Sequence, residues 1–352
     1  MFTKILSSFC LMIVFIGCSD STESQIDNLF RTYHGDVPGA AVMVIYKGAI
    51  HFEKYYGLAN IEDKSPVTRN TNFRLASATK QFTAMSILQL MEAGHLDFNT
   101  KLKTIFPELP AYADSINYGQ LLHHTSGLID YESLIPESAT VPVRDADILT
   151  LLMAQDSTYF RPGTNYSYSN GGYALLALTV ERLSEMSFPQ YLENKIFEPV
   201  GMRGSIAYVN GLNTIQNRAF GYHVQNNTTR FSDQSMTSSV LGDGGIYSST
   251  ADLYKWDQIL YTNQLLSQAS MDSAFTPWLE SYGCGWRIED YKGLKRISHT
   301  GGTCGFRTVI QRFPEQEFSV IVLTNRRDPG VQYLAEAITD IVLDLRNDTP
   351  IE

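Results

Sequence analysis

Two groups of strand-forming sequence lie at opposite ends of the chain, with a long helical stretch between them. Near the N-terminus, Ala40 to Tyr46 form a continuous β-rich run, and Ile50 to Tyr56 alternate in polarity after a turn at Lys47-Gly48, which predicts a hairpin. Turn residues separate four more predicted strands in the last third, at residues 285–289, 295–299, 308–313 and 318–323. Because a sheet must bury its apolar face against other elements, we expect both groups to join in one antiparallel sheet.

The segment between the two strand groups is predicted to be mainly helical. Residues 96–240 read as helices and loops, and the clearest helices are 148–154 and 173–183. A helix that starts near Ser77 is apolar almost all round, which is typical of a buried, central helix. The predicted fold class is α+β, with an antiparallel sheet from the N- and C-terminal segments, flanking helices that include 331–345, and a mainly helical lobe. The site is expected in the cleft between the lobes.

The first residues predict export. An apolar stretch from Ile5 to Ile16 is too short to span a bilayer as a helix and is typical of a secretory signal over residues 1–17. Cys18 follows Phe-Ile-Gly and resembles the lipidated cysteine of bacterial lipoproteins, and a plain signal peptide cut nearby is the alternative. We expect residues 18–35 to form a linker and a short helix ahead of one domain at 36–348, facing the periplasm or the cell exterior. Membrane contact is expected only through the lipid.

Charge and cysteine content narrow the possible partners. The formal net charge of −10 repels phosphate backbones, and no Lys/Arg run offsets it, so nucleic acid is not expected as a partner. With Cys18 lipidated, Cys284 and Cys304 are the only cysteines of the exported chain that could pair. An exported compartment permits a disulfide, and the sequence leaves open whether these two form one or stay as small buried thiols.

Three short motifs carry candidate chemistry, and the first is Ser77-Ala78-Thr79-Lys80. Three-residue spacing on a helix puts the serine and the lysine on one face. A serine hydroxyl needs a nearby base, and a lysine can serve when desolvation or a neighbouring cation favours its neutral form. The start of a helix also favours developing negative charge. Taken alone, the motif also fits a helix-capping serine with a solvated lysine.

The second motif is Tyr168-Ser169-Asn170, in the loop before the helix predicted at 173. Residues i and i+2 of an extended loop point the same way. A phenol beside a lysine could therefore shuttle a proton, while the amide holds a substrate carbonyl. Aromatic core packing with a helix cap is the alternative.

The third motif is His299-Thr300-Gly301, followed by Gly302, at the end of a predicted strand. Glycines let the backbone approach a ligand closely. The N–H of Gly302 could then pair with that of Ser77 as an oxyanion hole. A simple turn between strands is the alternative.

Taken together, the three motifs resemble those of the serine β-lactamase and penicillin-recognising enzyme superfamily, most closely its class C β-lactamase-related branch. That branch uses Ser-x-x-Lys, Tyr-x-Asn and Lys/His-x-Gly in this order. The resemblance covers residues 25 to 345 approximately. It is supported by the stretches FRLASATK (73–80), LLHHTSGL (121–128), PGTNYSYSNGGYALLAL (162–178), IFEPVGM (196–202), GDGGIYSSTADLYKW (242–256), YGCGW (282–286) and HTGGTCGF (299–306).

The resemblance implies a β-lactamase/transpeptidase-like fold and a serine hydrolase that works through an acyl-enzyme. Ser77 would attack an acyl carbonyl, and Lys80 and Tyr168 would move the serine proton to the leaving group. The backbone N–H groups of Ser77 and Gly302 would hold the oxyanion.

Substrate contacts are implied by the same resemblance. Asn170 and His299 would orient the substrate, with Thr300 helping to grip a carboxylate, and Tyr131 would line the pocket. Ser126, in the HTSG stretch, has no base at a similar spacing and is interpreted as part of a structural turn.

One residue departs from the pattern of class C β-lactamases proper, which usually carry Lys where this chain has His299. Histidine titrates near 6.5, so carboxylate binding is expected to be weaker or pH-dependent. A His there resembles D,D-carboxypeptidases, D-amino-acid peptidases and some esterases. We therefore expect slow or no β-lactam turnover.

Two other function classes fit parts of the sequence. A non-catalytic binder or sensor could keep the penicillin-binding shape, although intact Ser77, Lys80 and Tyr168 argue against it. A metallohydrolase is disfavoured because no HExxH-type pair is present and the adjacent His123 and His124 point differently. We expect no metal or cofactor and a small-molecule or peptide acyl substrate. The sequence leaves open which peptide, amide, ester or β-lactam it is, and the oligomeric state.

Overall fold

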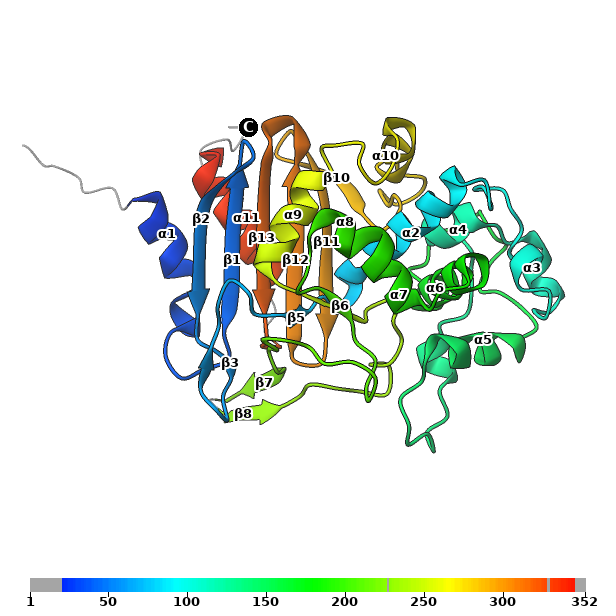
Figure 1. Cartoon of the computed structure of the whole chain (residues 1–352), viewed down its shortest axis with the longest axis horizontal. Coiled ribbons are helices and arrows are strands. Elements are labelled where there is room, and N and C mark those ends of the chain that lie inside the picture. The colour runs from blue at the N-terminus through cyan, green and yellow to red at the C-terminus, as the bar shows by residue number, and fades with distance from the viewer. Residues whose placement is uncertain (1–20, 227, 328–329, 346–352) are drawn as a thin grey trace, which may run out of the picture.

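A six-stranded antiparallel sheet forms the centre of the molecule (Figure 1). The computed structural model describes residues 21–226, 228–327 and 330–345. In spatial order the strands are β10 (Arg287–Tyr291), β11 (Leu294–Thr303), β12 (Phe306–Phe313), β13 (Phe318–Thr324), β1 (Ala40–Tyr46) and β2 (Ala49–Tyr56). The N-terminal hairpin therefore pairs with the C-terminal strands, and the predicted α+β fold is confirmed.

The position of strand β1 inside the sheet explains why its sequence is apolar without interruption. It pairs with β13 on one side, from Ala40 opposite Thr324 to Tyr46 opposite Phe318, and with β2 on the other. Alternate side chains of β1 enter two different apolar clusters, one on each face of the sheet. A strand that is buried on both faces has no position for a polar residue.

Helices cover both faces of the sheet. α1 (Thr22–Leu29) and α11 (Val331–Val342) pack against each other over the smaller cluster. α9 (Thr250–Ile259) packs on β1 and β13, and its residues belong to the larger cluster on the opposite face. Both faces are thereby shielded from water, as an apolar sheet requires.

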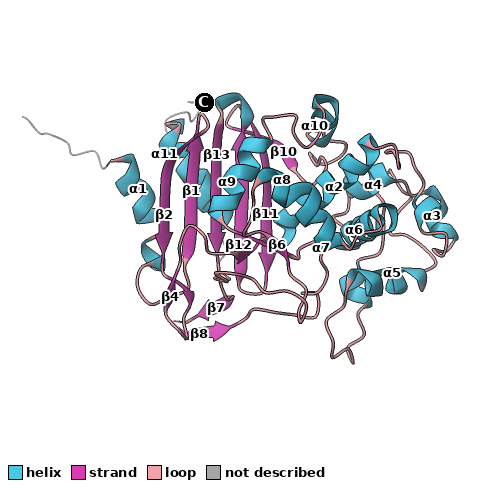
Figure 2. Ribbon diagram, viewed as in Figure 1, coloured by secondary structure: helices cyan, strands magenta, loops and turns pink. Residues whose placement is uncertain are grey.

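The helical lobe stands beside the β10–β11 side of the sheet (Figure 2). α2 (Lys80–Glu92) is buried along nearly its whole length and contacts α6, as the all-round apolar pattern predicted. The other helices beside the sheet are α3 (Leu102–Ile105), α4 (Tyr118–Leu122), α5 (Asp145–Met153), α6 (Asn170–Ser184), α7 (Phe188–Leu192), α8 (Glu198–Val200) and α10 (Gln268–Ala274).

Short strands tie distant segments together. The pairs and triplets are β3 (Leu58–Asn60) with β4 (Ser65–Pro66), β7 (Tyr222–Gln225) with β8 (Thr228–Phe231), and β5 (Phe73–Arg74), β9 (Ile246–Ser248) and β6 (Ile206–Ala207) in one sheet. In that three-stranded sheet Arg74 lies opposite Tyr247. This pairing brings the chain just before Ser77 next to the chain just after residues 241–245.

Several strand boundaries differ from prediction, and two of them have a clear physical reason. β11 runs on to Thr303 instead of ending at His299, so the third motif lies within a strand. Glycines are poor strand formers and hid this extension. β10 begins at Arg287 instead of Gly285, whose positive φ of 78° breaks the extended backbone.

The predicted signal segment and the predicted cysteine alternatives have different outcomes. Residues 1–17 and Cys18 lie outside the described residues, so the signal and lipid predictions stay predictions. No helix of the described segments is long and apolar enough to cross a membrane. Cys284 and Cys304 are both free thiols, the first buried and the second partly exposed, so the disulfide alternative is not adopted in this structure.

Candidate active site

A tight turn presents Ser77 at the start of the central helix. The α-helix itself begins at Lys80, and residues 76–79 form a 3₁₀ turn in front of it. Ala76 has a left-handed φ of 49°, which is strained for a residue with a side chain. Such strain costs roughly 1–3 kcal/mol and persists only where the surroundings enforce it. Here the enforcing contact is the Leu75 N–H, which donates to the carbonyl oxygen of Ile246 at 2.8 Å.

Lys80 is fully buried and points at Ser77. Its Nζ lies 3.3 Å from the Ser77 Oγ, 2.8 Å from the Asn170 Oδ1 and 2.9 Å from the backbone oxygen of Asp243. The side chain is 0% exposed. An ammonium group has three donors, and these contacts use all of them. The structure thus fixes the lysine head against the serine from three sides.

The Tyr168 ring packs beside the same lysine. The Lys80 Nζ lies 4.8 Å from the Tyr168 ring centroid, and the His124 ring lies 4.2 Å from it on a tilted plane. Among the described residues, the buried Tyr168 hydroxyl has no hydrogen-bond partner. Leaving a buried hydroxyl unpaired costs about 1–3 kcal/mol, so the group is available to a partner that the free protein lacks.

Asn170 connects the lysine to a residue that the sequence analysis did not single out. Its Oδ1 accepts from Lys80, and its Nδ2 donates to the Glu132 Oε1 at 3.2 Å. Contrary to the expected loop position, Asn170 is the first residue of α6, and Ser169 caps that helix by accepting from the Gly172 N–H. The helix start holds the amide more rigidly than a loop would.

Gly301 lets β11 reach the serine turn. A Cβ at this position would lie 2.0 Å from the backbone oxygen of Leu75 and 2.4 Å from the Thr308 Oγ1. Thr308 also donates to the same Leu75 oxygen at 2.8 Å. Only a residue without a side chain permits this approach, which brings the following Gly302 to the same side as Ser77.

Ser77 opens into a small hollow between β11 and the helical lobe. We call this the Ser77 hollow, and its volume is about 50 Å³. It is lined by Arg74, Ala76, Ser77, Glu132, Asn170, Thr237, Asp243, Gly244, Gly302 and Thr303. The structure therefore brings Ser77, Asn170 and Gly302, predicted from three separate motifs, to one place.

The expected role of His299 needs correction. The imidazole is buried, its Nδ1 donates to the Thr300 oxygen at 2.6 Å, and its Nε2 accepts from the Tyr282 hydroxyl at 2.9 Å. Burial, assisted by the nearby Lys80 charge, lowers the pKa of His299 to about 3. It is a neutral residue with both nitrogens occupied, not a group that titrates near 6.5. Thr300 is half-buried and absent from the hollow lining, where Thr303 stands instead.

The buried neutral His299 should make the stability of the folded protein depend on pH. Between the ordinary histidine pKa of about 6.5 and the folded value of about 3, the unfolded chain binds a proton that the folded protein does not. The free energy of unfolding should therefore fall as pH drops from 6.5 toward 3. His299→Gln should flatten this dependence, measured as melting temperature against pH. A slope identical to that of the wild type would contradict the assignment.

Tyr131 does not line the pocket as predicted. It is fully buried, and its hydroxyl donates to the Asp243 Oδ2 at 3.0 Å. The next residue, Glu132, is exposed and lines the Ser77 hollow. In this 3₁₀ turn, consecutive side chains point in different directions, and the sequence pattern could not tell which one faces the site.

Residues 241–244 form one wall of the site, in which Asp243 and Gly244 line the hollow, and sequence reasoning missed this segment as a functional element. Thr83 donates to the Gly242 oxygen at 2.7 Å, and Arg74 donates to the Gly244 oxygen at 3.1 Å. Gly242 is required because a Cβ there would lie 2.3 Å from the Tyr173 oxygen. The run GDGG was visible in the sequence, but its contacts come from segments far away.

The Asp145 carboxylate holds the same wall in place through hydrogen bonds to its backbone. Its two carboxylate oxygens accept from the backbone N–H groups of Leu241 and Gly242 at 2.8 and 3.0 Å. Burial raises the pKa of Asp145 to about 7 and that of Asp243 to about 6. Asp145 is thus a positioning residue for the backbone oxygen of Asp243 that holds Lys80.

Asp145→Asn should loosen this wall. An amide can accept only one of the two N–H bonds, so a buried donor is left unpaired at a cost of about 1–3 kcal/mol. We expect a lower melting temperature and roughly tenfold weaker turnover. Asp147→Asn is the matched control, since Asp147 lies on the same helix but is 43% exposed and, among the described residues, pairs only with Arg144. Equal effects of both variants would contradict a specific role for Asp145.

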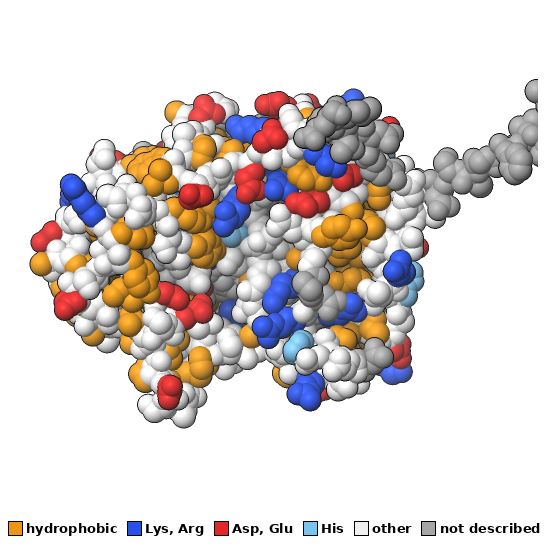
Figure 3. Space-filling view, turned by 180° about the vertical axis from the view of Figure 1, so that it is seen from behind, with side chains coloured by type: hydrophobic (Ala, Val, Ile, Leu, Met, Phe, Trp, Pro, Cys, Tyr) orange, Lys and Arg blue, Asp and Glu red, His pale blue; other side chains and the backbone are white. Residues whose placement is uncertain are grey.

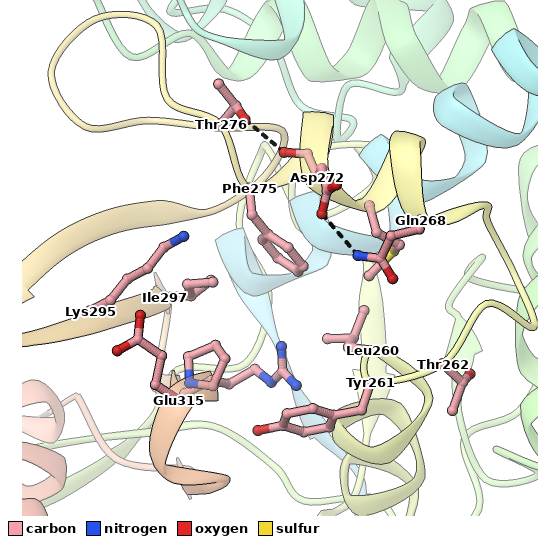
Figure 4. Close-up of a pocket in the computed structure, with 13 residues that line it drawn as sticks. Leu260, Tyr261, Thr262, Gln268, Asp272, Phe275, Thr276, Lys295, Ile297 and Glu315 are labelled. Carbon is pink, nitrogen blue, oxygen red and sulfur yellow. Dashed lines mark hydrogen bonds between the residues drawn. The ribbon is translucent and has the colours of Figure 1, made fainter.

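A larger cavity lies elsewhere and offers no comparable chemistry. It has a volume of about 510 Å³ and is lined by residues of α10, β11 and β12, including Lys295 (Figure 4). Its buried Arg312 is bound to Asp257 through Nε at 2.7 Å. Neither Ser77 nor Lys80 lines it, so the smaller hollow is the candidate site. Within the described part of the chain, no cluster of three or more metal-binding side chains was found.

Comparison with known proteins agrees with this geometry. The Beta-lactamase family model matches residues 26–343. Penicillin-binding protein 4* of Bacillus subtilis (strain 168) is 34% identical over 309 residues, covering 82% of this chain and 68% of that protein. The octameric penicillin-binding protein homologue from Pyrococcus abyssi has a TM-score of 0.80 at 25% identity, covering 92% of this chain and 77% of that one.

A crystal structure of D-amino acid amidase from Ochrobactrum anthropi SV3 shares the fold, with a TM-score of 0.79 at 21% identity over 92% of this chain and 98% of that one. The family match and the relatives support a serine-hydrolase type of role. This chain belongs to the β-lactamase family, within the superfamily of serine β-lactamases and penicillin-binding proteins.

Proposed function

We propose that this protein is an exported serine hydrolase that cleaves an amide or ester through an acyl-enzyme on Ser77. The observation that carries the proposal is the 3.3 Å contact between the Lys80 Nζ and the Ser77 Oγ at the edge of a hollow. A lysine held against a serine by two further acceptors is arranged for proton transfer, not for solvation.

The acylation step requires a net transfer of one proton from the Ser77 hydroxyl to the leaving group. The step requires Lys80 as the free amine: the Ser77 oxygen attacks the carbonyl carbon, and the Lys80 amine accepts the hydroxyl proton across their contact. The Tyr168 hydroxyl, which has no protein partner among the described residues, passes a proton to the leaving amine or alcohol as its bond to carbon breaks, and Lys80 then passes the serine proton to the Tyr168 oxygen. Water then attacks the Ser77 ester along the reverse proton route, which releases the acid and restores the serine.

Charge on the carbonyl oxygen must be stabilised during both steps. The N–H groups of Ser77 and Gly302 are our candidates for that role, because both residues line the hollow. Asn170 would hold the acyl side of the substrate while its own oxygen stays bonded to Lys80. His299 would act indirectly, by keeping Tyr282 and the start of the third motif in place.

A three-substrate panel tests the proposal: an activated acyl ester, a D-Ala-D-Ala peptide and the cephalosporin nitrocefin. We expect turnover of the ester or the peptide and slow or no hydrolysis of nitrocefin, since a neutral His299 offers no fixed positive charge to a β-lactam carboxylate. Mass spectrometry should find the acyl group on the peptide that contains Ser77. An adduct that never hydrolyses would instead favour the binder or sensor function, and fast nitrocefin turnover would contradict the substrate class.

Export and lipid anchoring are part of the same proposal. The apolar stretch before Cys18 supports them. Mass spectrometry of the mature N-terminus should find a diacylglyceryl-modified Cys18. An unmodified N-terminus at another residue would rule out the lipid anchor.

A further inference from the structure

Glu132 stands at the edge of the Ser77 hollow with a largely unused carboxylate. It belongs to a 3₁₀ turn at Tyr131–Leu134, whose start is capped by Asp130 accepting from the Glu132 N–H at 3.3 Å. Its side chain is exposed, yet it lines the same hollow as the nucleophile. The turn thus holds the residue in place while its carboxylate stays open to a ligand.

Its bonding leaves most of its acceptor capacity free. Among the residues that the structure describes, the only hydrogen bond to the side chain is from the Asn170 Nδ2 to Oε1, at 3.2 Å. Across residues 21–226, 228–327 and 330–345, no Lys, Arg or His forms an ion pair with it within 4.0 Å. An ionised carboxylate can accept about four hydrogen bonds. At least one of its oxygens is therefore available to a cation from outside.

The other charged groups of the hollow are already engaged. Asp243 is buried and accepts from Tyr131. Arg74 uses Nε and both terminal nitrogens on protein oxygens at 2.8 to 3.3 Å. Glu132 is the charged side chain that remains for a substrate. Figure 3 shows the surface hollow between the two lobes, with acidic side chains on its helical-lobe rim and Lys and Arg side chains on the opposite rim.

We infer that Glu132 binds an ammonium group of the substrate, so that amides or esters of amino acids and peptides with a free amine near the scissile carbonyl are preferred. The inference rests on the proposed function. Asn170 separates Glu132 from Lys80, accepting from the lysine and donating to the glutamate. An amine held at Glu132 would therefore lie next to the acyl carbonyl without approaching the Lys80 charge directly.

The test compares D- and L-alanine p-nitroanilide with their N-acetyl forms on the full chain. For the preferred enantiomer, wild type should favour the free amine, and Glu132→Gln should lower the ratio of kcat/KM values, free amine over acetylated, about tenfold. That is the size expected for one partly screened charged hydrogen bond. Glutamine keeps an oxygen acceptor for Asn170. Glu137→Gln is the matched control, because Glu137 is exposed in the following loop and does not line the hollow.

The ratio separates a specificity role from a purely positioning one. If Glu132→Gln lowers turnover of both forms equally, or leaves the ratio unchanged, the inference is wrong. Binding of the same pair to Ser77→Ala, measured by calorimetry, should show the same preference without any turnover. Failure of wild type to acylate either substrate would defeat the proposed function, whereas equal binding of both forms would defeat only the ammonium site.

Discussion

Ser77→Ala is expected to lower turnover of any acyl substrate by at least about 10⁴-fold, because the proposed acyl-enzyme forms on Ser77 and the remaining site residues act around it. KM should change little, since the hollow keeps its other walls. The measurement is single-turnover kinetics with an activated ester, together with labelling by a fluorescent penicillin or a phosphonate. Labelling should disappear completely.

Ser126→Ala supplies the control for that experiment. Ser126 is also buried in the lobe, but its hydroxyl only accepts from the Leu128 N–H at 3.4 Å. It has no lysine partner among the described residues, so activity should persist with a modest loss of stability. Should Ser77→Ala keep more than a few per cent of activity while Ser126→Ala loses it, the nucleophile has been misassigned.

Gly301→Ala should be among the most damaging single-methyl changes in the chain. The added carbon would need to occupy space 2.0 Å from the Leu75 oxygen, which is backbone and cannot rotate away. β11 would have to move off the serine turn, breaking the 2.8 Å bond from Thr308 to Leu75. We expect destabilisation of about 3 kcal/mol or more and near-complete loss of activity. Thermal unfolding and ester hydrolysis measure the two effects.

Gly302→Ala is the control that tests whether the destabilisation is specific to position 301. The three atoms nearest to a Cβ at Gly302 all belong to the Arg307 side chain, at 3.4 Å, and that side chain can shift. The melting temperature of this variant should stay within a few degrees of the wild type. Similar melting temperatures for both alanine variants would show that Gly301 is not a close-approach position.

Much of the fold followed from local pattern. The apolar run at Ala40–Tyr46 is a strand because alternate residues of β1 face two clusters, and the all-round apolar helix from Lys80 is buried as its composition required. The hydrophobic periodicity of a segment indicates which of its faces are buried. It failed at Gly301 and Gly302, where the strand continues through residues that usually end one.

The candidate site was only partly accessible to the same reasoning. Spacing placed Ser77 and Lys80 on one face, and the resemblance linked them to Tyr168 and Asn170. Neither spacing nor the resemblance could indicate that Glu132, and not Tyr131, faces the hollow. Nor could they reveal Asp145, whose contact with residues 241 and 242 joins segments nearly 100 positions apart.

The order of amino acids therefore sufficed to identify the family and to place Lys80 beside Ser77, because those depend on short spacings and on which faces avoid water. Burial and long-range contact decided the rest. They made His299 a neutral, doubly bonded residue, left the Tyr168 hydroxyl unpaired, and left Glu132 as the free charge of the hollow. Protonation and access to ligand depend on what surrounds a group in space, and those surroundings come from chain segments that are remote in sequence.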